Sequence, residues 1–315
     1  MAIQLLAGSP ATPIERLVED YLSNCAARGL SLRTVDKDYG YSLHSRFLPW
    51  CRSEGIQSLD DLDRRAVDRF STFLLSHRKE DGQPLSKYSV HTYIRPVRQM
   101  LTWAKEIGEE VQAKPQLPRR SKPLRDVLSR EEIDRLELSL STERDRLIIR
   151  IFADCGLRLE ELTRISPGDI VRSGRQAHIR VLGKRDRVRD VPIMPLLLRR
   201  LERHIQFRPT ERTGDRVFLA ERRSPLGLYE PLTVDGVYKV VKDAVVRSGI
   251  EKRVYPHLLR HSWMTEMLRN GMNPIQLSII AGASPEVIAQ CYTHLTRDDA
   301  YAATLRIMTT QRSGR

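Results

Sequence analysis

The stretch HLLRHSWMTEMLRNGMNPIQLSIIAGASPEVIAQCYTHL, residues 257–295, combines helix-like sequence with polar side chains suited to contact with a phosphate. His257 and Arg260 are three residues apart, and on a helix this spacing places both on one face, where a phosphate can contact both. Tyr292 lies near the other end, in the string CYTH. If Tyr292 approached the same phosphate, His257 and Arg260 would already have neutralised the negative charge of that phosphate. The rest of the chain is then expected to hold a polyanion against Tyr292.

The composition points to nucleic acid as that polyanion. Lys and Arg number 53 against 40 Asp and Glu, which gives a net charge of +13. A soluble protein that is merely basic is the alternative. No apolar run approaches the ~18 residues of a membrane-spanning helix, and the N-terminus does not resemble a signal peptide. We therefore expect no membrane association and a cytoplasmic protein located at the nucleoid.

The sequence predicts neither a metal nor a cofactor. The four cysteines, Cys25, Cys51, Cys155 and Cys291, form no CxxC pair and have no His at metal-ligand spacing. Core or surface thiols are favoured over zinc ligands. The chain also has no P-loop, no GxGxxG motif and no acidic metal cluster.

Residues 13–107 have the pattern of a small all-α domain. Helices are predicted from Pro13 to Gly29, over 31–55, over 62–79 and over 86–107, with no strand signal. Pro96 is expected to bend or break the last of these helices. Arg95 and Arg98 on that helix are candidate DNA-binding residues.

Residues 108–125 are predicted to be a linker, because three prolines occur there without a periodic apolar face. The linker is expected to cross the DNA backbone between two domains, and a plain solvated tether is the alternative. Arg119, Arg120 and Lys122 are candidate DNA contacts.

Residues 126–297 are predicted to form a second domain that mixes helices with a β-hairpin. A capping box at Ser129 begins a helix, and the apolar run 143–156 predicts a core helix. Arg158 is expected in the first turn of the next helix, where backbone N–H groups favour an anion. Residues 177–193 alternate as a hairpin with its turn at 183–186. Helices follow over 195–207 and 233–248.

The hairpin carries a concentration of positive charge. Seven Lys or Arg residues against one Asp occur between residues 172 and 189. Such a run is usually a solvated face, but a β-ribbon also has a shape that can enter a DNA groove. Lys184 and Arg185, at the expected tip, are therefore candidate DNA contacts.

These pieces together resemble the tyrosine recombinase (phage integrase) family. The resemblance rests on Arg158 in GLRLEEL, Lys184 at a hairpin tip, HLLRH around Arg260, and Tyr292 in YTHL, in this order and spacing. It covers residues 13–297 and has the two-domain layout of Xer-like recombinases and integrases. It implies a mainly α protein with a small sheet (α+β), in which an all-α, SAM-like core-binding domain precedes a mixed α/β catalytic domain.

The site chemistry follows from the residue types. Transesterification at a phosphodiester builds negative charge on the non-bridging oxygens, and two Arg guanidiniums match it, so Arg158 and Arg260 are assigned to this task. A Tyr phenol has a pKa of about 10 and needs a proton acceptor, a role suited to His257. Lys184 is the candidate proton donor to the leaving 5′-oxygen, with Arg185 or another Lys as alternative. Glu161 could hold Arg158 or His257 in place.

The resemblance also implies the course of the reaction. DNA would be cut through a 3′-phosphotyrosyl bond, without metal or ATP, and strands exchanged through a Holliday junction. The partners would be two double-stranded DNA sites and a homotetramer, or a hetero-oligomer with related recombinases. Residues 298–315 would dock on a neighbouring protomer through Tyr301, Leu305 and Met308. The sequence does not reveal whether the recombinase serves a phage, a transposon, an integron-like array or a chromosome-dimer resolution system. DNA integration and transposition by a mobile element are among the expected roles.

One position departs from the family pattern. Nine residues before Tyr292 the family has His or Trp after Gly, and this chain has Ala283. The substitution removes one donor to the phosphate, which His294 or a residue from elsewhere could replace. It leaves a catalytically weakened or inactive DNA-binding paralogue as an alternative. A type IB topoisomerase-like or telomere-resolving enzyme is a further alternative.

Overall fold

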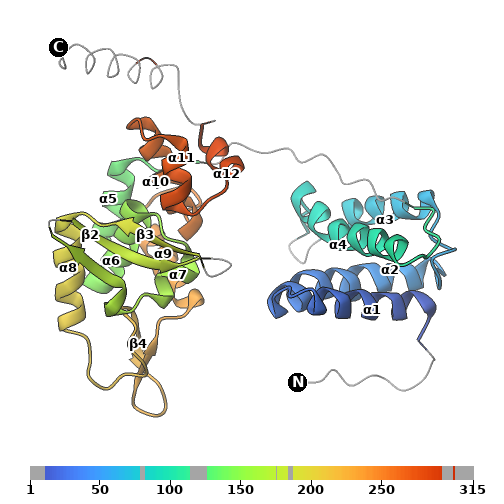
Figure 1. Cartoon of the computed structure of the whole chain (residues 1–315), viewed down its shortest axis with the longest axis horizontal. Helices are drawn as coiled ribbons and strands as arrows, with labels where there is room; N and C mark the ends of the chain where they lie inside the picture. Colours follow the sequence, from blue (N-terminus) through green and yellow to red (C-terminus); the bar gives the residue numbers. More distant parts are fainter. Residues whose placement is uncertain are drawn as a thin grey trace. The chain divides into compact units, whose positions relative to one another are not determined.

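The computed structural model describes residues 11–78, 82–113, 126–174, 176–183, 187–292 and 301. The chain divides into two compact units, Met1–Pro123 and Leu124–Arg315 (Figure 1). Each has its own hydrophobic core. Several predicted positions lie outside the described residues, namely the greater part of the linker and of the C-terminal segment, together with Arg119, Arg120, Lys122, Lys184 and Arg185.

The first unit is helical, as predicted. Helix α1 spans Pro13–Ala27 and begins with a capping box in which Thr12 and Glu15 satisfy each other's backbone N–H groups. The predicted second helix contains two π-helical segments, η1 (Thr34–Gly40) and η2 (Leu43–Phe47), before α2 (Leu48–Ser53). Pro49 has no N–H to continue the α-helical ladder, which is a physical reason for the altered pairing in η2 directly before it.

Two further helices complete the core of the first unit. Helix α3 spans Arg64–Ser76 and α4 spans Lys87–Glu106. Pro96 lies inside α4 and does not break it, contrary to one of the two outcomes expected. Neighbouring buried residues of α4 pack against the core, and this packing offsets the lost hydrogen bond.

The second unit packs helices around a small sheet. The helices are α5 (Arg130–Leu138), α6 (Glu143–Arg150), η3 (Ile151–Cys155), α7 (Leu159–Arg164), η4 (Pro167–Asp169), α8 (Pro195–Gln206) and α9 (Val234–Ser248). Most of their apolar faces join one core cluster, in which Leu147, Ile148 and Phe152 are fully buried. The mainly α, α+β class is confirmed.

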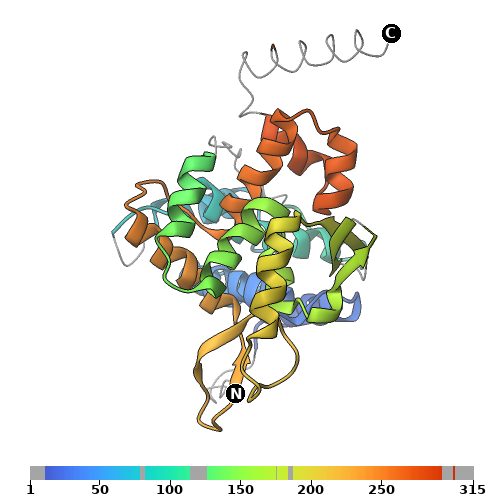
Figure 2. The ribbon, with the colours of Figure 1, turned by 90° about the vertical axis from the view of Figure 1, so that its left-hand side faces the viewer.

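The sheet of the second unit has the strand order β1-β2-β3. The predicted hairpin consists of β2 (Gln176–Leu182) and β3 (Val188–Pro192), paired antiparallel with Leu182 opposite Val188. Strand β1 (Ile170–Ser173) was not predicted, nor was a second hairpin of β4 (Leu219–Arg223) and β5 (Tyr229–Pro231). Figure 2 shows this second hairpin extending away from the helices.

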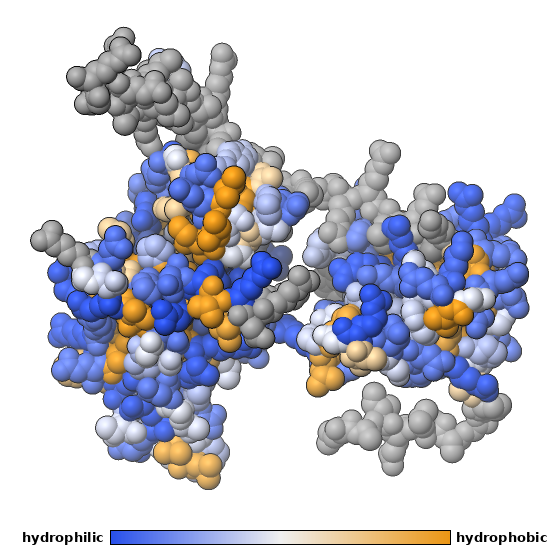
Figure 3. Space-filling view, in the orientation of Figure 1, coloured by the Kyte–Doolittle hydropathy of each residue, from blue (hydrophilic) through white to orange (hydrophobic). Residues whose placement is uncertain are grey.

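The stretch 257–292 forms three helices with a small core of their own. These are α10 (Pro256–Arg269), α11 (Pro274–Ala281) and α12 (Pro285–Cys291). Trp263, Leu277 and Ile288 are among the buried residues that join them. Figure 3 shows a largely hydrophilic surface on both units, with apolar side chains around α10–α12. In the described part of the chain, no helix is long and apolar enough to cross a membrane.

Candidate functional site

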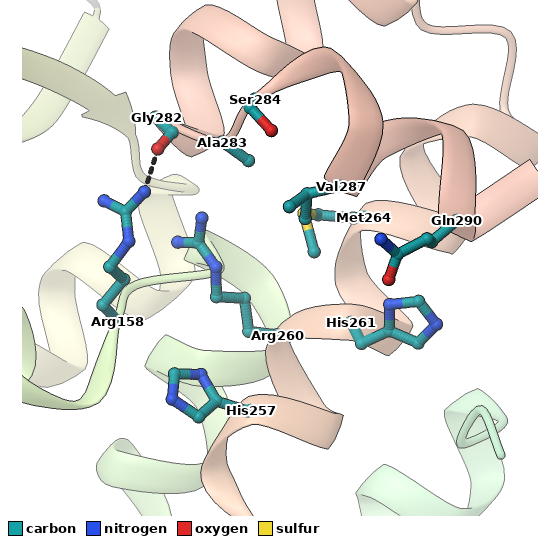
Figure 4. Close-up of a pocket in the computed structure, with 10 residues that line it drawn as sticks. All are labelled: Arg158, His257, Arg260, His261, Met264, Gly282, Ala283, Ser284, Val287 and Gln290. Atoms are coloured by element: carbon teal, nitrogen blue, oxygen red, sulfur yellow. Dashed lines mark hydrogen bonds between the residues drawn. The ribbon is translucent and has the colours of Figure 1, made fainter. Parts of the chain in front are cut away.

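A cavity of about 250 Å³ lies between the start of α7, the first turns of α10 and the junction of α11 with α12 (Figure 4). It is lined by Arg158, His257, Arg260, His261, Met264, Gly282, Ala283, Ser284, Val287 and Gln290. Segments more than a hundred residues apart in sequence therefore meet at one site, with two guanidiniums and an imidazole beside each other on one wall.

Arg158 is held at the N-cap of α7, one position before the expected first turn. Its backbone N–H donates to Glu161 Oε2 at 2.7 Å and its Nη1 to Glu161 Oε1 at 2.7 Å. Its Nη2 donates to the carbonyl of Gly282 (Figure 4). About a third of the side chain, 34%, is still exposed. The guanidinium is thus oriented by protein contacts and accessible from the cavity.

Arg260 lines the cavity but is largely buried, with 5% of its surface exposed. Its Nη2 donates to the Ala281 carbonyl at 2.5 Å and its Nη1 to the Gly156 carbonyl. Burial, and then the positive charge of Arg158, lower the pKa of Arg260 to about 10. Arg260 therefore remains positively charged at neutral pH.

His257 and Arg260 share a face of α10, as predicted, and both line the cavity. His257 lies in the first turn, after Pro256, and is exposed. His261, the next residue of α10, is buried, and its Nδ1 lies 3.4 Å from Cys291 Sγ.

The C-terminus of α11 gathers three arginines through three consecutive carbonyls. The carbonyls of Ile280, Ala281 and Gly282 accept from Arg189, Arg260 and Arg158, respectively. The C-terminal carbonyls of a helix have no partner within it and carry partial negative charge, so guanidiniums are suitable partners.

Gly282 permits this arrangement. Its φ of +59° is in the left-handed region, and a Cβ there would lie 3.2 Å from both Arg158 Nη1 and Arg189 Cζ. Gly156, before Arg158, is similarly constrained: its φ is +60°, and a Cβ would lie 2.0 Å from Trp263.

Glu161 joins two of the arginines. Its side chain is 5% exposed and pairs with Arg158 and Arg189. Burial by itself would raise the pKa of Glu161, but hydrogen bonds from Arg189 and Arg158 outweigh it and lower the pKa to about 2. Glu161 is therefore a carboxylate throughout the neutral range. The sequence indicated its contact with Arg158 but not the one with Arg189.

Ala283 lines the cavity with a methyl group where a donor was expected. Its backbone is fixed, because Ala283 N–H donates to Ser278 O at 3.1 Å and Ser278 Oγ donates to Ala283 O at 2.6 Å. The neighbouring backbone is therefore ordered around a side chain that cannot donate.

Tyr292 follows the last residue of α12 and is 42% exposed. The preceding residue, Cys291, is fully buried and contacts His261 of α10. This contact ties the chain beside Tyr292 to the same helix that carries His257 and Arg260. All four cysteines are buried, as expected for core thiols.

The structure brings five of the predicted residues together, namely Arg158, Glu161, His257, Arg260 and Ala283. Arg95 and Arg98 line a separate cavity in the first unit, together with Arg28 and Trp103. Arg189 was missed as a site residue. Its only signal in the sequence was its place at the end of the charge run, where it could not be distinguished from solvated neighbours.

Residues 126–298, more than half of the chain, match the sequence model of the phage integrase family. The chain belongs to the phage integrase family. Its matched segment contains every element of the cavity.

Several relatives in this family are similar over nearly their whole length. Tyrosine recombinase XerD of Listeria innocua is 28% identical over 295 residues, which cover 89% of this chain and 94% of the relative. Phage integrase family membership and these relatives identify the chain as a tyrosine-type site-specific recombinase.

Solved structures share the fold. The XerH site-specific recombinase bound to difH substrate in a pre-cleavage complex has a TM-score of 0.69 at 18% identity, covering 96% of this chain and 99% of that one. A lambda integrase tetramer bound to a Holliday junction has a TM-score of 0.67 at 16% identity, covering 90% and 78%.

Proposed function

We propose that this recombinase cuts and rejoins double-stranded DNA by attack of Tyr292 on a phosphodiester held by Arg158 and Arg260. The observation that carries the proposal is the convergence of Arg158, His257 and Arg260 on one cavity, with Tyr292 on the adjoining helix end. The cavity is open to solvent and its charged wall is cationic, so an anion from outside can enter it.

The two guanidiniums would bind the non-bridging oxygens of the scissile phosphate. Each already donates to backbone carbonyls, which orients the planar group before DNA arrives. Donors positioned in advance need little reorganisation as charge builds in the transition state. Arg260 stays charged at working pH, because its pKa is lowered only to about 10.

The proton transfers are assigned to His257 and Lys184. His257 is exposed at the cavity wall and would accept the phenolic proton of Tyr292, or orient the acceptor. Lys184, between β2 and β3 in sequence, would protonate the leaving 5′-oxygen. The product would be a 3′-phosphotyrosyl bond and a 5′-hydroxyl. This bond retains the energy of the cleaved ester, so rejoining requires neither metal nor ATP.

We further propose that residues 13–107 are the core-binding domain, 108–125 the linker and 126–297 the catalytic domain. Arg95 and Arg98 line one cavity of the first unit with Arg28, and Arg95 also contacts Tyr39, its Nη2 lying 3.2 Å from the hydroxyl. Such a basic surface is suited to DNA phosphates. Arg119, Arg120, Lys122 and Arg185 are proposed as additional contacts.

Strand exchange is proposed to take place in a tetramer on paired DNA sites through a Holliday junction. The lambda integrase structure of that composition has the same fold and supports this proposal. Residues 298–315 would dock on a neighbouring protomer. A protein with this role would be found at the nucleoid.

Covalent trapping tests the proposal. Fragments from the neighbourhood of the gene would first be screened for binding by gel shift. The protein and Tyr292→Phe would then be incubated with the bound fragment, labelled and nicked near the candidate site, without metal or ATP. We expect a protein–DNA adduct on denaturing electrophoresis with the natural chain and none with Tyr292→Phe. Binding without any adduct from the natural chain would contradict the proposal.

A further inference from the structure

Arg189 of β3 is a buried arginine whose side chain is fully engaged by the site. Only 9% of the side chain is exposed. Its Nη1 and Nη2 donate to the two oxygens of Glu161 at 2.7 and 2.8 Å, and its Nε donates to the Ile280 carbonyl at 2.8 Å. This paired geometry is one that arginine can make and lysine cannot.

These contacts connect three elements that are distant in sequence. Arg189 lies on β3 opposite Val181 of β2, Glu161 lies on α7, and Ile280 is near the end of α11. One guanidinium therefore connects the β2–β3 hairpin to the helix that presents Arg158 and to the helix end that orients all three arginines.

Arg189 also limits the number of hydrogen bonds that the Glu161 carboxylate can accept from Arg158. Glu161 Oε1 accepts from Arg189 Nη1 and Arg158 Nη1, and Oε2 accepts from Arg189 Nη2 and the Arg158 backbone N–H. The carboxylate is thus fully occupied, and the Arg158 side chain makes a single contact with it. Without Arg189, a buried carboxylate would lack two donors and would attract the remaining N–H groups of Arg158.

We infer that Arg189 is a positioning residue for DNA cleavage: it occupies Glu161 so that the Arg158 guanidinium stays available to phosphate, and it fixes the turn end of the β2–β3 hairpin beside the site. The inference rests on the proposed function, since it assigns a role within the same reaction. Arg189 itself does not line the cavity. Its effect is exerted through Arg158 and through the hairpin that carries Lys184.

The test compares Arg189→Gln and Arg189→Lys with a matched control, Arg200→Gln. Arg200 of α8 is likewise ion-paired, although with two carboxylates, Glu143 at 2.7 Å and Glu137 at 2.7 Å, and neither it nor its partners line the cavity. The control therefore removes a similar part-buried ion-pair network elsewhere in the same unit. For each variant, thermal unfolding, DNA binding and the rate of adduct formation on a nicked substrate would be measured.

We expect Arg189→Gln to bind DNA as the natural chain does and to form adduct about 100-fold more slowly. A displacement of the Arg158 guanidinium by about 1 Å is enough for a loss of this size. Arg189→Lys should retain part of the rate, because it keeps the charge but not the paired geometry. Arg200→Gln should lose stability without a comparable fall in adduct rate.

A pH profile separates positioning from general loss of structure. Removing Arg189 removes the main hydrogen-bond partner that lowers the pKa of Glu161, so burial should raise that pKa. The deficit of Arg189→Gln should then shrink as the pH falls from 7 towards 5, because Glu161 takes up a proton and releases Arg158 to the phosphate. Arg200→Gln should follow the natural chain across this range.

A rate for Arg189→Gln equal to that of Arg200→Gln would overturn the inference, provided that the natural chain forms adduct. If Arg189→Gln does not fold, the double variant Glu161→Gln/Arg189→Gln removes both charges of the buried pair. A double variant no slower than Glu161→Gln alone supports action through Glu161. A double variant at least about 10-fold slower than Glu161→Gln alone contradicts it. Absence of adduct from the natural chain would contradict the proposed function instead.

Discussion

The Arg158 guanidinium donates to the carbonyl of Gly282, a residue 124 positions later in the chain. This contact places the first predicted phosphate ligand directly beside the position where the family has a His or Trp and this chain has Ala283. Arg158 and Ala283 are therefore parts of one wall of the cavity (Figure 4). A substitution at either position should alter the position of the other residue.

Gly282→Ala should impair cleavage beyond its effect on stability. The left-handed φ should cost about 1 kcal/mol of unfolding free energy for any side chain. The added Cβ would also lie 3.2 Å from Arg158 Nη1 and so displace the guanidinium. Gly249→Ala is a matched control, because Gly249 has φ +66° and nothing within 4 Å of its Cβ. Urea unfolding should rank the two variants close together, whereas adduct formation should fall only for Gly282→Ala. Equal adduct rates would contradict the role assigned to this contact.

Gly156→Ala should destabilise the second unit severely. Its Cβ would lie 2.0 Å from the Trp263 ring, so either the ring or the backbone must move. With the left-handed φ included, we expect a loss of about 3 kcal/mol or more in urea unfolding. Gly249→Ala again isolates the backbone contribution. A loss no larger than that of the control would show that Trp263 adjusts freely.

Glu161→Gln should change the acid dependence of stability. The folded-state pKa of Glu161 is depressed to about 2 from 4.5, so its ionised form contributes stability above pH 4.5, and this contribution is lost as the pH falls towards 2. The difference in unfolding free energy between the natural chain and Glu161→Gln should therefore be largest at neutral pH and shrink below pH 4.5. Chemical denaturation at several pH values checks this. A difference that stays constant from pH 7 to pH 3 would argue against the ionised network.

Ala283→His should increase cleavage. It would restore a donor at the cavity wall, and a single donor to a developing oxyanion contributes about 10-fold or more to rate. Ala289→His is the control, because Ala289 is exposed on α12 and does not line the cavity. The rate of adduct formation on a nicked substrate is the measurement. No gain over Ala289→His would show that this chain does not use a donor at position 283.

Deletion of residues 298–315 should leave DNA binding intact and reduce recombination. The predicted docking of this segment concerns assembly of protomers on paired sites, whereas the cavity residues precede it in sequence. Gel shifts would measure binding to a single site, and a two-site plasmid assay would measure recombination. Recombination at the natural level by the truncated chain would refute docking through this segment.

Much of the fold was predictable because its signals are local. Apolar periodicity, the capping residue Ser129 and the helix-ending Gly156 all act within a few residues, and the helices they predict are present. The π-helical segments and the unbroken α4 around Pro96 were not predictable in this way, because packing against the rest of the first core decides them. The short strands β1, β4 and β5 carry too few residues for a clear alternation.

The sequence by itself determined which side chains could carry the chemistry. Arg158, His257, Arg260 and Tyr292 stand in motifs whose order and spacing identify the family, and Ala283 is visible as a departure from them. Only the tertiary structure decided how the arginines are oriented. Arg189, one cation among several in a charge run, becomes a site residue because β3 passes beside α11, whose last carbonyls lack helical partners. Long-range contacts of this kind depend on the packing of separate elements, and no local pattern encodes them.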